Sequence, residues 1–285
     1  VSFKAAHVQD EDPRQFIPDP ATADMYRDVR FPLPKPADPK YLSMLPIEVH
    51  HSENRRRWAV RFSTPELYQQ SVRNYYRLIS EVDREVGRIR QMLKSRNQSE
   101  NTVILFSSDN GFYLSEHGLA GKWIPHEESL RVPLIVYDPR AGNAQRGKRR
   151  SEMTLNIDIA PTILRTAGLP VPTGVQGRDL APLLQNSAGA GASWRKEFFY
   201  EHDFSNGWIP RTEGIRDTRW KYIRYLDIQP LFEELYDLAA DPEETNNLAR
   251  NSRYSGELER LRGRWKTWRD HLSAYNVQQP WSEPA

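Results

Sequence analysis

The sequence has 285 residues, of which 38% are apolar, 27% charged and 11% aromatic. Lys and Arg number 40 against 38 Asp and Glu, and no apolar run approaches the roughly 20 residues of a membrane-spanning helix. This excludes a membrane span, gives no sign of a nucleic-acid partner, and allows one large domain or a main domain with a smaller one. The sequence contains no cysteine, so it has no disulfide, thiolate nucleophile or Cys-based zinc site.

The first elements expected along the chain are a long irregular segment and a long helix. Residues 8–50 are rich in Pro, Asp and Lys and show little periodicity, which is typical of a long loop that serves or covers a site. Ser63 and Glu66 then form a capping box with Pro65 in the first turn. Apolar residues follow at spacings of 4 and 3, and predict an amphipathic helix over 64–97.

Two short apolar runs follow this helix. "TVILFS" (102–107) is continuously apolar, as expected for a buried parallel strand against which the 64–97 helix packs, and "RVPLIVYDP" (131–139) predicts a second strand. "NIDIAPTILRTAG" (156–168) indicates a loop that enters a short helix closed by Gly168. A helix that feeds a buried strand indicates an α/β layer fold.

The pattern changes after the Gly/Ala/Ser-rich stretch near residue 186. Alternating runs between about 190 and 238 predict a small antiparallel sheet, with Trp220, Tyr222 and Tyr225 in its core or interface. "ELERLRGRWKTWRDHL" then predicts a helix packed on that sheet, and Trp208 lies on an irregular segment that either lines a cleft or packs. We place the boundary so that the main domain is 1–187 and the C-terminal subdomain 188–285.

The "TVILFS" run ends in Ser-Ser-Asp-Asn-Gly, where an open α/β sheet would hold its ligands. Asp109 and Asn110 offer an anionic and a neutral oxygen, which suit Ca²⁺ or Mg²⁺. Asp-Asn-Gly alone is more typical of a turn than of a metal site. Lys122, His117 and His126 follow at once, and together with the two oxygens they make a site for a tetrahedral anion as reasonable an interpretation as separate structural roles.

The run "SSDNGFYLSEHGLAGKWIPHEESLRVPLIV" resembles the second signature region of the type I sulfatases of the alkaline phosphatase superfamily. "FKAAH", "LNIDIAPTIL" with "VQGRDLAPLL", and "ELYDLAADPEETNNLA" resemble further family segments in the same order. The resemblance implies an alkaline-phosphatase-like, mostly parallel sheet flanked by helices, with a smaller C-terminal α+β subdomain. It also implies a periplasmic or secreted sulfuric ester hydrolase that acts on a sulfated small molecule or carbohydrate.

The resemblance assigns roles to six residues. Asp109 and Asn110 match metal ligands, normally to calcium. Lys122 matches a sulfate-contacting lysine and His7 a histidine near the leaving-group oxygen. Lys4 and His117 lie in the matching segments, which places them near the substrate pocket. A cation, a lysine and a histidine around a tetrahedral anion would stabilise the charge that develops in sulfuryl transfer.

One part of the family pattern is missing. The family's nucleophile is a formylglycine made from Cys or Ser in a Cys/Ser-x-Pro-x-Arg motif, and the closest match, Ser63-Thr64-Pro65, lacks the Arg. The paired aspartates that complete the metal site normally lie upstream of that motif. We therefore expect this chain to correspond to the later part of a sulfatase, to bind calcium weakly and to hydrolyse no sulfate ester by itself.

Two alternatives remain at this stage. A phosphodiesterase or phosphonate hydrolase of the same superfamily would use the same cation, lysine and histidine. A non-catalytic sulfatase-like module would have kept the fold without the nucleophile. Neither the substrate's regiochemistry nor the oligomeric state follows from the sequence. The basic run "RGKRR" (146–150) is typical of a solvated loop, with an anionic-ligand contact as the alternative.

Overall fold

The structure, a computed structural model, describes residues 1–142, 145–185, 189–204 and 207–284. It comprises two compact units: unit 1 is Val1–Thr102, Asn110–Arg131 and Phe204–Pro210, and unit 2 is Val103–Asp109, Val132–Asp203 and Arg211–Ala285. Unit 2 continues on both sides of the boundary expected between 187 and 188. Residues 186–188 lie outside the described residues, and the domain boundary stays a prediction.

Unit 1 is mainly helical. Its irregular N-terminal segment contains only short helices, as the sequence predicts for 8–50: η1 (Pro20–Thr22), η2 (Lys35–Ala37), α1 (Pro39–Leu42) and α2 (Ile47–His50). The remaining elements of unit 1 are α3 (Glu53–Phe62), α4 (Pro65–Ser95), η3 (Ser99–Asn101), β2 (Tyr113–Leu114), η4 (Glu116–Gly118), β3 (Ala120–Gly121) and α5 (Glu127–Leu130).

Helix α4 confirms the long amphipathic helix, but its cap differs from the prediction. The N-cap is Thr64, whose Oγ1 accepts a hydrogen bond from the Leu67 N–H at 3.2 Å. Ser63 cannot serve as this cap, since it already follows Phe62 as the C-cap of α3. The buried residues of α4 lie in its first half and pack on the N-terminal segment and on Phe62.

Unit 2 holds the strands β1 (Ile104–Ser107) and β4 (Leu134–Tyr137) and a separate four-stranded sheet. Its helices are η6 (Asn156–Asp158), α6 (Ile159–Thr166), α7 (Ala181–Leu184), η7 (Ser252–Tyr254) and α8 (Ser255–Ala274). The sheet strands are β5 (Glu197–His202), β6 (Thr212–Asp217), β7 (Trp220–Tyr225) and β8 (Glu233–Asp237).

The predicted buried parallel strand at 102–107 is wrong in two respects. β1 pairs antiparallel with β4, with Ile104 opposite Tyr137 and Ser107 opposite Leu134, and all four of its residues are only partly buried. An apolar run carries no information about strand direction, which depends on the partner. Because α4 and β1 belong to different units, packing of that helix on the sheet stays a prediction.

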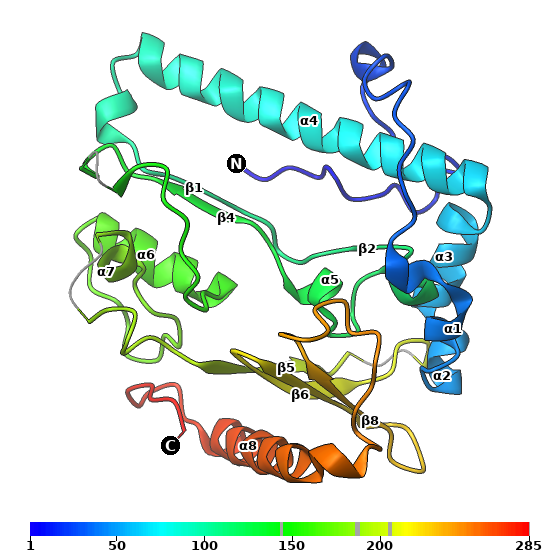
Figure 1. Cartoon of the computed structure of the whole chain (residues 1–285). Coiled ribbons are helices and arrows are strands. Elements are labelled where there is room, and N and C mark those ends of the chain that lie inside the picture. Colours follow the sequence, from blue (N-terminus) through cyan, green and yellow to red (C-terminus); the bar gives the residue numbers. More distant parts are fainter. Residues whose placement is uncertain (143–144, 186–188, 205–206, 285) are drawn as a thin grey trace. The chain divides into compact units, whose positions relative to one another are not determined.

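The C-terminal sheet confirms the expected antiparallel subdomain. Its strands run in the order β5-β6-β7-β8, all antiparallel, and α8 lies along one face (Figure 1). Tyr222 lies in the core between sheet and helix, Trp220 packs against that core, and Tyr225 is fully buried, so these three aromatics help to build the subdomain as predicted. Among the described residues, none of the helices combines the length and apolar character needed to cross a membrane.

Candidate active site

The segment after β1 folds into a small hairpin that places Asn110 and Lys122 side by side. β2 and β3 pair antiparallel, with Tyr113 opposite Gly121. Asn110 precedes the first strand and Lys122 follows the second, so both emerge at the open end of the hairpin. The Lys122 Nζ donates to Asn110 Oδ1 at 2.6 Å.

The glycine of Asp-Asn-Gly has a packing role. The Gly111 N–H donates to the Ser129 carbonyl at 2.8 Å, and a Cβ on Gly111 would lie 2.0 Å from the Glu128 carbonyl oxygen. No side chain fits there without moving α5. The turn residues therefore do more than reverse the chain, because they bring the backbone after Asn110 against a helix.

The hairpin loop and the segment just after β3 contain several residues in the left-handed region. Ser115 has a φ of 94°, His117 of 55° and Trp123 of 89°. Such conformations cost about 1–3 kcal/mol each in non-glycine residues and persist where surrounding contacts enforce them, often at functional sites. The strain therefore marks 115–123 as a segment held in place by its surroundings.

His117 lies inside this loop. Its ring is buried, stacks on His126 with the ring centres 4.5 Å apart, and meets Tyr113 edge-on. The ring therefore packs beneath the loop, and a substrate contact by His117 stays a prediction.

Helix α3 holds the Lys122 segment through polar contacts that the sequence analysis did not identify. The fully buried Asn54 donates from Nδ2 to the carbonyls of Ala120 at 3.0 Å and Lys122 at 2.6 Å. Arg55 donates to the Gly118 carbonyl at 2.9 Å, and the Arg57 guanidinium lies 4.9 Å from the Trp123 ring centre. The backbone on both sides of Lys122 is thereby fixed.

His7 and Lys4 are exposed residues of one tight turn, closed by a hydrogen bond from the His7 N–H to the Lys4 carbonyl at 2.7 Å. The His7 Nδ1 lies 2.8 Å from the Val8 carbonyl oxygen. A carbonyl oxygen can only accept, so Nδ1 carries the proton and Nε2 is the nitrogen that remains for proton transfer. Lys4 donates from Nζ to Gln9 at 3.1 Å.

A buried arginine of α3 holds the loop that follows His7. Arg61 is 1% exposed and donates to Asp10 Oδ1 at 2.8 Å and to Gln15 Oε1 at 2.9 Å. Burial is the main reason why the pKa of Arg61 falls to about 10. Its guanidinium also lies 5.9 Å from the Phe112 ring centre.

The residues flanking His7 and Asn110 meet in one apolar cluster. Val8 and Phe16 are buried there, and Ala6 and Phe112 pack against them. Unit 1 therefore brings the segment that carries His7 to the segment that carries Asn110 and Lys122, although they are about a hundred residues apart in the sequence.

Asp109 belongs to unit 2 and is exposed at the end of β1. Its carbonyl and that of Ser108 accept hydrogen bonds from the Asn156 side chain. Asn156 precedes α6 within "LNIDIAPTIL". That stretch resembles a family segment, and no local pattern in it distinguishes Asn156.

The donor chemistry of Asp109 and Asn110 fits a hard cation, but the described residues supply only part of a cage. Ca²⁺ takes 6–8 oxygen ligands. Within the described ranges, no group of three or more His, Cys, Asp or Glu side chains is gathered as a metal site would need.

Two protein-family models match this sequence. The model described as Sulfatase matches residues 5–169, and the model described as N-sulphoglucosamine sulphohydrolase, C-terminal, matches residues 115–271. Each match covers more than half of the chain.

Curated relatives agree with these matches. An N-acetylglucosamine-6-O-sulfatase of Bacteroides thetaiotaomicron is 38% identical over 198 residues, which are 68% of this chain and 35% of that protein. The multifunctional alkaline phosphatase superfamily protein PehA of Trinickia caryophylli is 34% identical over 209 residues, 68% of this chain and 39% of that protein. The chain thus spans little more than a third of the length of these relatives.

Solved structures show the same likeness. A protein in complex with its substrate D-glucosamine-2-N,6-O-disulfate has a TM-score of 0.80 and 25% identity, over 96% of this chain and 65% of that one. A phosphonate monoester hydrolase of Silicibacter pomeroyi has a TM-score of 0.78 and 25% identity, over 92% of this chain and 54% of that one. These neighbours confirm the expected α/β fold with a C-terminal subdomain.

Proposed function

The chain belongs to the sulfatase family, and from this membership we propose that it serves the hydrolysis of sulfate esters, with a sulfated carbohydrate as the substrate. The relative with 38% identity is a sulfatase of N-acetylglucosamine 6-sulfate, and a structural neighbour holds a disulfated glucosamine. Sulfated amino sugars are therefore the first substrates to test. A periplasmic or secreted location is proposed on the family resemblance alone.

The observation that carries the proposal is the fixed pair of Lys122 and Asn110. Asn54 holds the Lys122 backbone and Asn110 holds its ammonium, so the charge is oriented before a substrate arrives. Pre-oriented donors stabilise developing charge without reorganisation. An ammonium has three N–H donors, so the bond to Asn110 is compatible with further bonds to sulfate oxygens.

The other residues take complementary roles in this proposal. Asp109 and Asn110 would hold the cation, which when bound neutralises charge on the sulfate oxygens. In its imidazolium form, with both ring nitrogens protonated, His7 would give the Nε2 proton to the leaving oxygen and keep the Nδ1 proton on the Val8 carbonyl. Lys4 lies on the same turn and adds positive charge for an anionic substrate.

The residues of this chain do not fit a formylglycine. The sequence lacks cysteine and any Ser-x-Pro-x-Arg, and Ser63 ends α3 directly before the cap of α4. No bond-forming step is therefore assigned to a residue of this chain. Residues 1–285 alone are expected to bind calcium weakly and to show no turnover.

The test is a turnover assay in two formats. Residues 1–285 alone, and the full reading frame that contains them, co-expressed with a formylglycine-generating enzyme, receive 4-nitrophenyl sulfate, N-acetylglucosamine 6-sulfate and a 4-nitrophenyl phosphonate ester. We expect the matured full protein to hydrolyse the sulfates and to lose activity with a calcium chelator. In that protein Lys122→Ala should lower kcat/KM by about 100- to 1,000-fold, the effect typical of losing one oriented donor.

Lys94→Ala is the matched control, because Lys94 is an exposed lysine in the last turn of α4. Its activity should equal that of the parent protein. Faster hydrolysis of the phosphonate ester than of either sulfate would favour the phosphonate hydrolase that the Silicibacter pomeroyi neighbour represents. If the matured protein, with its formylglycine verified, hydrolyses none of the three substrates, a non-catalytic module is favoured. Turnover by residues 1–285 alone would contradict the assignment of the nucleophile outside this chain.

A further inference from the structure

The side-chain amide of Asn156 donates hydrogen bonds to two consecutive backbone carbonyls. Its Nδ2 donates to the carbonyl of Ser108 at 3.1 Å and to the carbonyl of Asp109 at 2.9 Å. The Asn156 side chain thus holds the carbonyls of two consecutive residues, Ser108 and Asp109, directly after β1. These bonds fix the backbone from which the Asp109 carboxylate projects.

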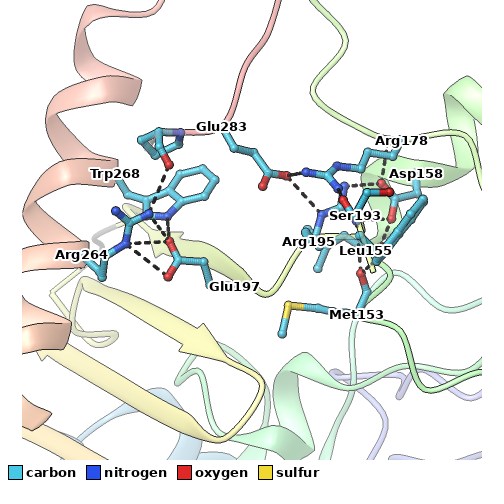
Figure 2. A network of polar contacts seen from close by, with 12 residues as sticks. Met153, Leu155, Asp158, Arg178, Ser193, Arg195, Glu197, Arg264, Trp268 and Glu283 are labelled. Carbon is cyan, nitrogen blue, oxygen red and sulfur yellow. Dashed lines mark hydrogen bonds and ion pairs between the residues drawn. The ribbon is translucent and has the colours of Figure 1, made fainter. Parts of the chain in front are cut away.

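The turn that presents Asn156 is closed by a buried carboxylate, that of Asp158 (Figure 2). Asp158 is fully buried and accepts from the backbone N–H groups of Leu155 and Arg178, each at 2.8 Å. The Arg195 guanidinium binds both carboxylate oxygens, with Nη2 to Oδ1 at 2.8 Å. A buried charge with every oxygen satisfied is costly to disturb, because removing one partner leaves the other unpaired.

The Asp158–Arg195 pair is itself enclosed on further sides. Glu283 reaches both arginines from one side (Figure 2), with Oε1 2.7 Å from Arg178 Nη2 and 3.6 Å from Arg195 Nε. Gly177 approaches the turn so closely that a Cβ would lie 1.8 Å from the Ile157 carbonyl oxygen. The turn of Asn156 is therefore rigid by hydrogen bonding and by packing.

We propose that Asn156 is a positioning residue for the cation ligand Asp109, and that the buried Asp158–Arg195 pair holds Asn156 in place for this purpose. The proposal rests on the proposed function. Partners that orient a metal ligand commonly matter 10- to 100-fold for metal affinity. An effect of this size is expected here, since Asp109 and Asn110 are the two ligands that this chain would offer and each must be placed before a cation binds.

The test compares Asn156→Leu, which removes the donor without adding charge, with Asn156→Gln, which keeps an amide. Asn246→Leu is the control, because Asn246 is exposed and its backbone N–H, which the substitution keeps, donates to Asp241. Hydrogen exchange of the peptide covering 103–112 is measured in the 285-residue chain without metal. Calcium dissociation constants are measured by calorimetry in the chain and in the full reading frame.

We expect Asn156→Leu to speed hydrogen exchange at residues 108–110 about tenfold and to weaken calcium binding at least tenfold. Asn156→Gln should show smaller changes in both quantities, and Asn246→Leu should change neither. Unchanged hydrogen exchange at residues 108–110 in Asn156→Leu would overturn the positioning role, whatever the measured calcium affinity. Faster exchange with calcium affinity within twofold of the parent would overturn the link to the cation. If the parent protein binds no calcium in either format, the cation part of the proposed function fails, while the exchange result still decides whether Asn156 holds the strand end.

Discussion

Arg61→Met is the substitution that best separates local order from global stability in this chain. Arg61 is 1% exposed on α3 and holds the loop after His7 through Asp10 and Gln15. Methionine keeps the length and apolar stem of the side chain but removes the guanidinium. The change therefore tests what the charge does, with little loss of packing.

Two opposing terms decide the effect on the free energy of unfolding. The pKa of Arg61 falls from 12.5 to about 10, chiefly through burial, so the charge costs the folded state about 3 kcal/mol at every pH below 10. Met removes that cost. It also leaves the buried Gln15 Oε1 without its donor, which costs about 1–3 kcal/mol. The two terms nearly cancel, so the free energy of unfolding should change by less than about 2 kcal/mol.

The loop should respond differently, because both of its hydrogen bonds with Arg61 are lost together, while the ion pair of Arg57 with Asp10, at 3.3 Å, still links Asp10 to α3. We expect amide exchange in residues 4–16 to rise about 10- to 30-fold, as two hydrogen bonds of about 1 kcal/mol each would give. Urea unfolding and hydrogen-exchange mass spectrometry measure the two quantities. Arg56→Met, on the same helix but 66% exposed in its pair with Glu53, is the control and should change neither. Unchanged exchange in 4–16, or a loss of stability above about 4 kcal/mol, would refute the argument.

Two further predictions concern tyrosine ionisation and an exposed tryptophan. Burial raises the pKa of Tyr68 from 10.0 to about 12, so an unfolded chain ionises first and the stability held below pH 10 is lost as the pH rises towards 12. Tyr68→Phe should cost about 1 kcal/mol at pH 8, through its bond to the Pro32 carbonyl, and become more stable than the parent near pH 12; parallel urea-unfolding curves across this range would contradict this. Trp208 is 64% exposed, so Trp208→Ala should leave the melting temperature within a degree or two while weakening affinity for a sulfated sugar several-fold; a loss of stability alone would assign Trp208 to packing.

The elements that the sequence predicts well are those with an apolar stripe. The stripe of α4 places Tyr68, Val72 and Leu78 on one buried face, and the alternation in β7 buries Tyr222 against α8. In both cases the apolar residues and the local conformation require the same periodicity, so the pattern and the fold agree. The direction of β1 had no such support, because a four-residue apolar run looks the same in either pairing.

Helix α3 was missed for the opposite reason. Its sequence, ENRRRWAVRF, has no apolar stripe, and its buried residues include Asn54 and Arg61. Hydrophobic periodicity does not detect a helix that buries polar side chains. In the sequence such side chains resemble a solvent-exposed face, because their hydrogen-bond partners are not known.

The same limit divides the candidate site into two classes of residue. The residue types of Lys122, Asn110 and His7 suit them to anion binding, cation binding and proton transfer, so a sequence motif is enough to identify them as candidates. Asn54, Arg61 and Asn156 act on backbone carbonyls or on neighbouring loops, and nothing in their local sequence distinguishes them from surface residues. Their role depends on which distant segment lies opposite, which only the fold decides. The sequence therefore identifies the candidate residues that would contact a sulfate. The residues that position those candidates are found only from the structure.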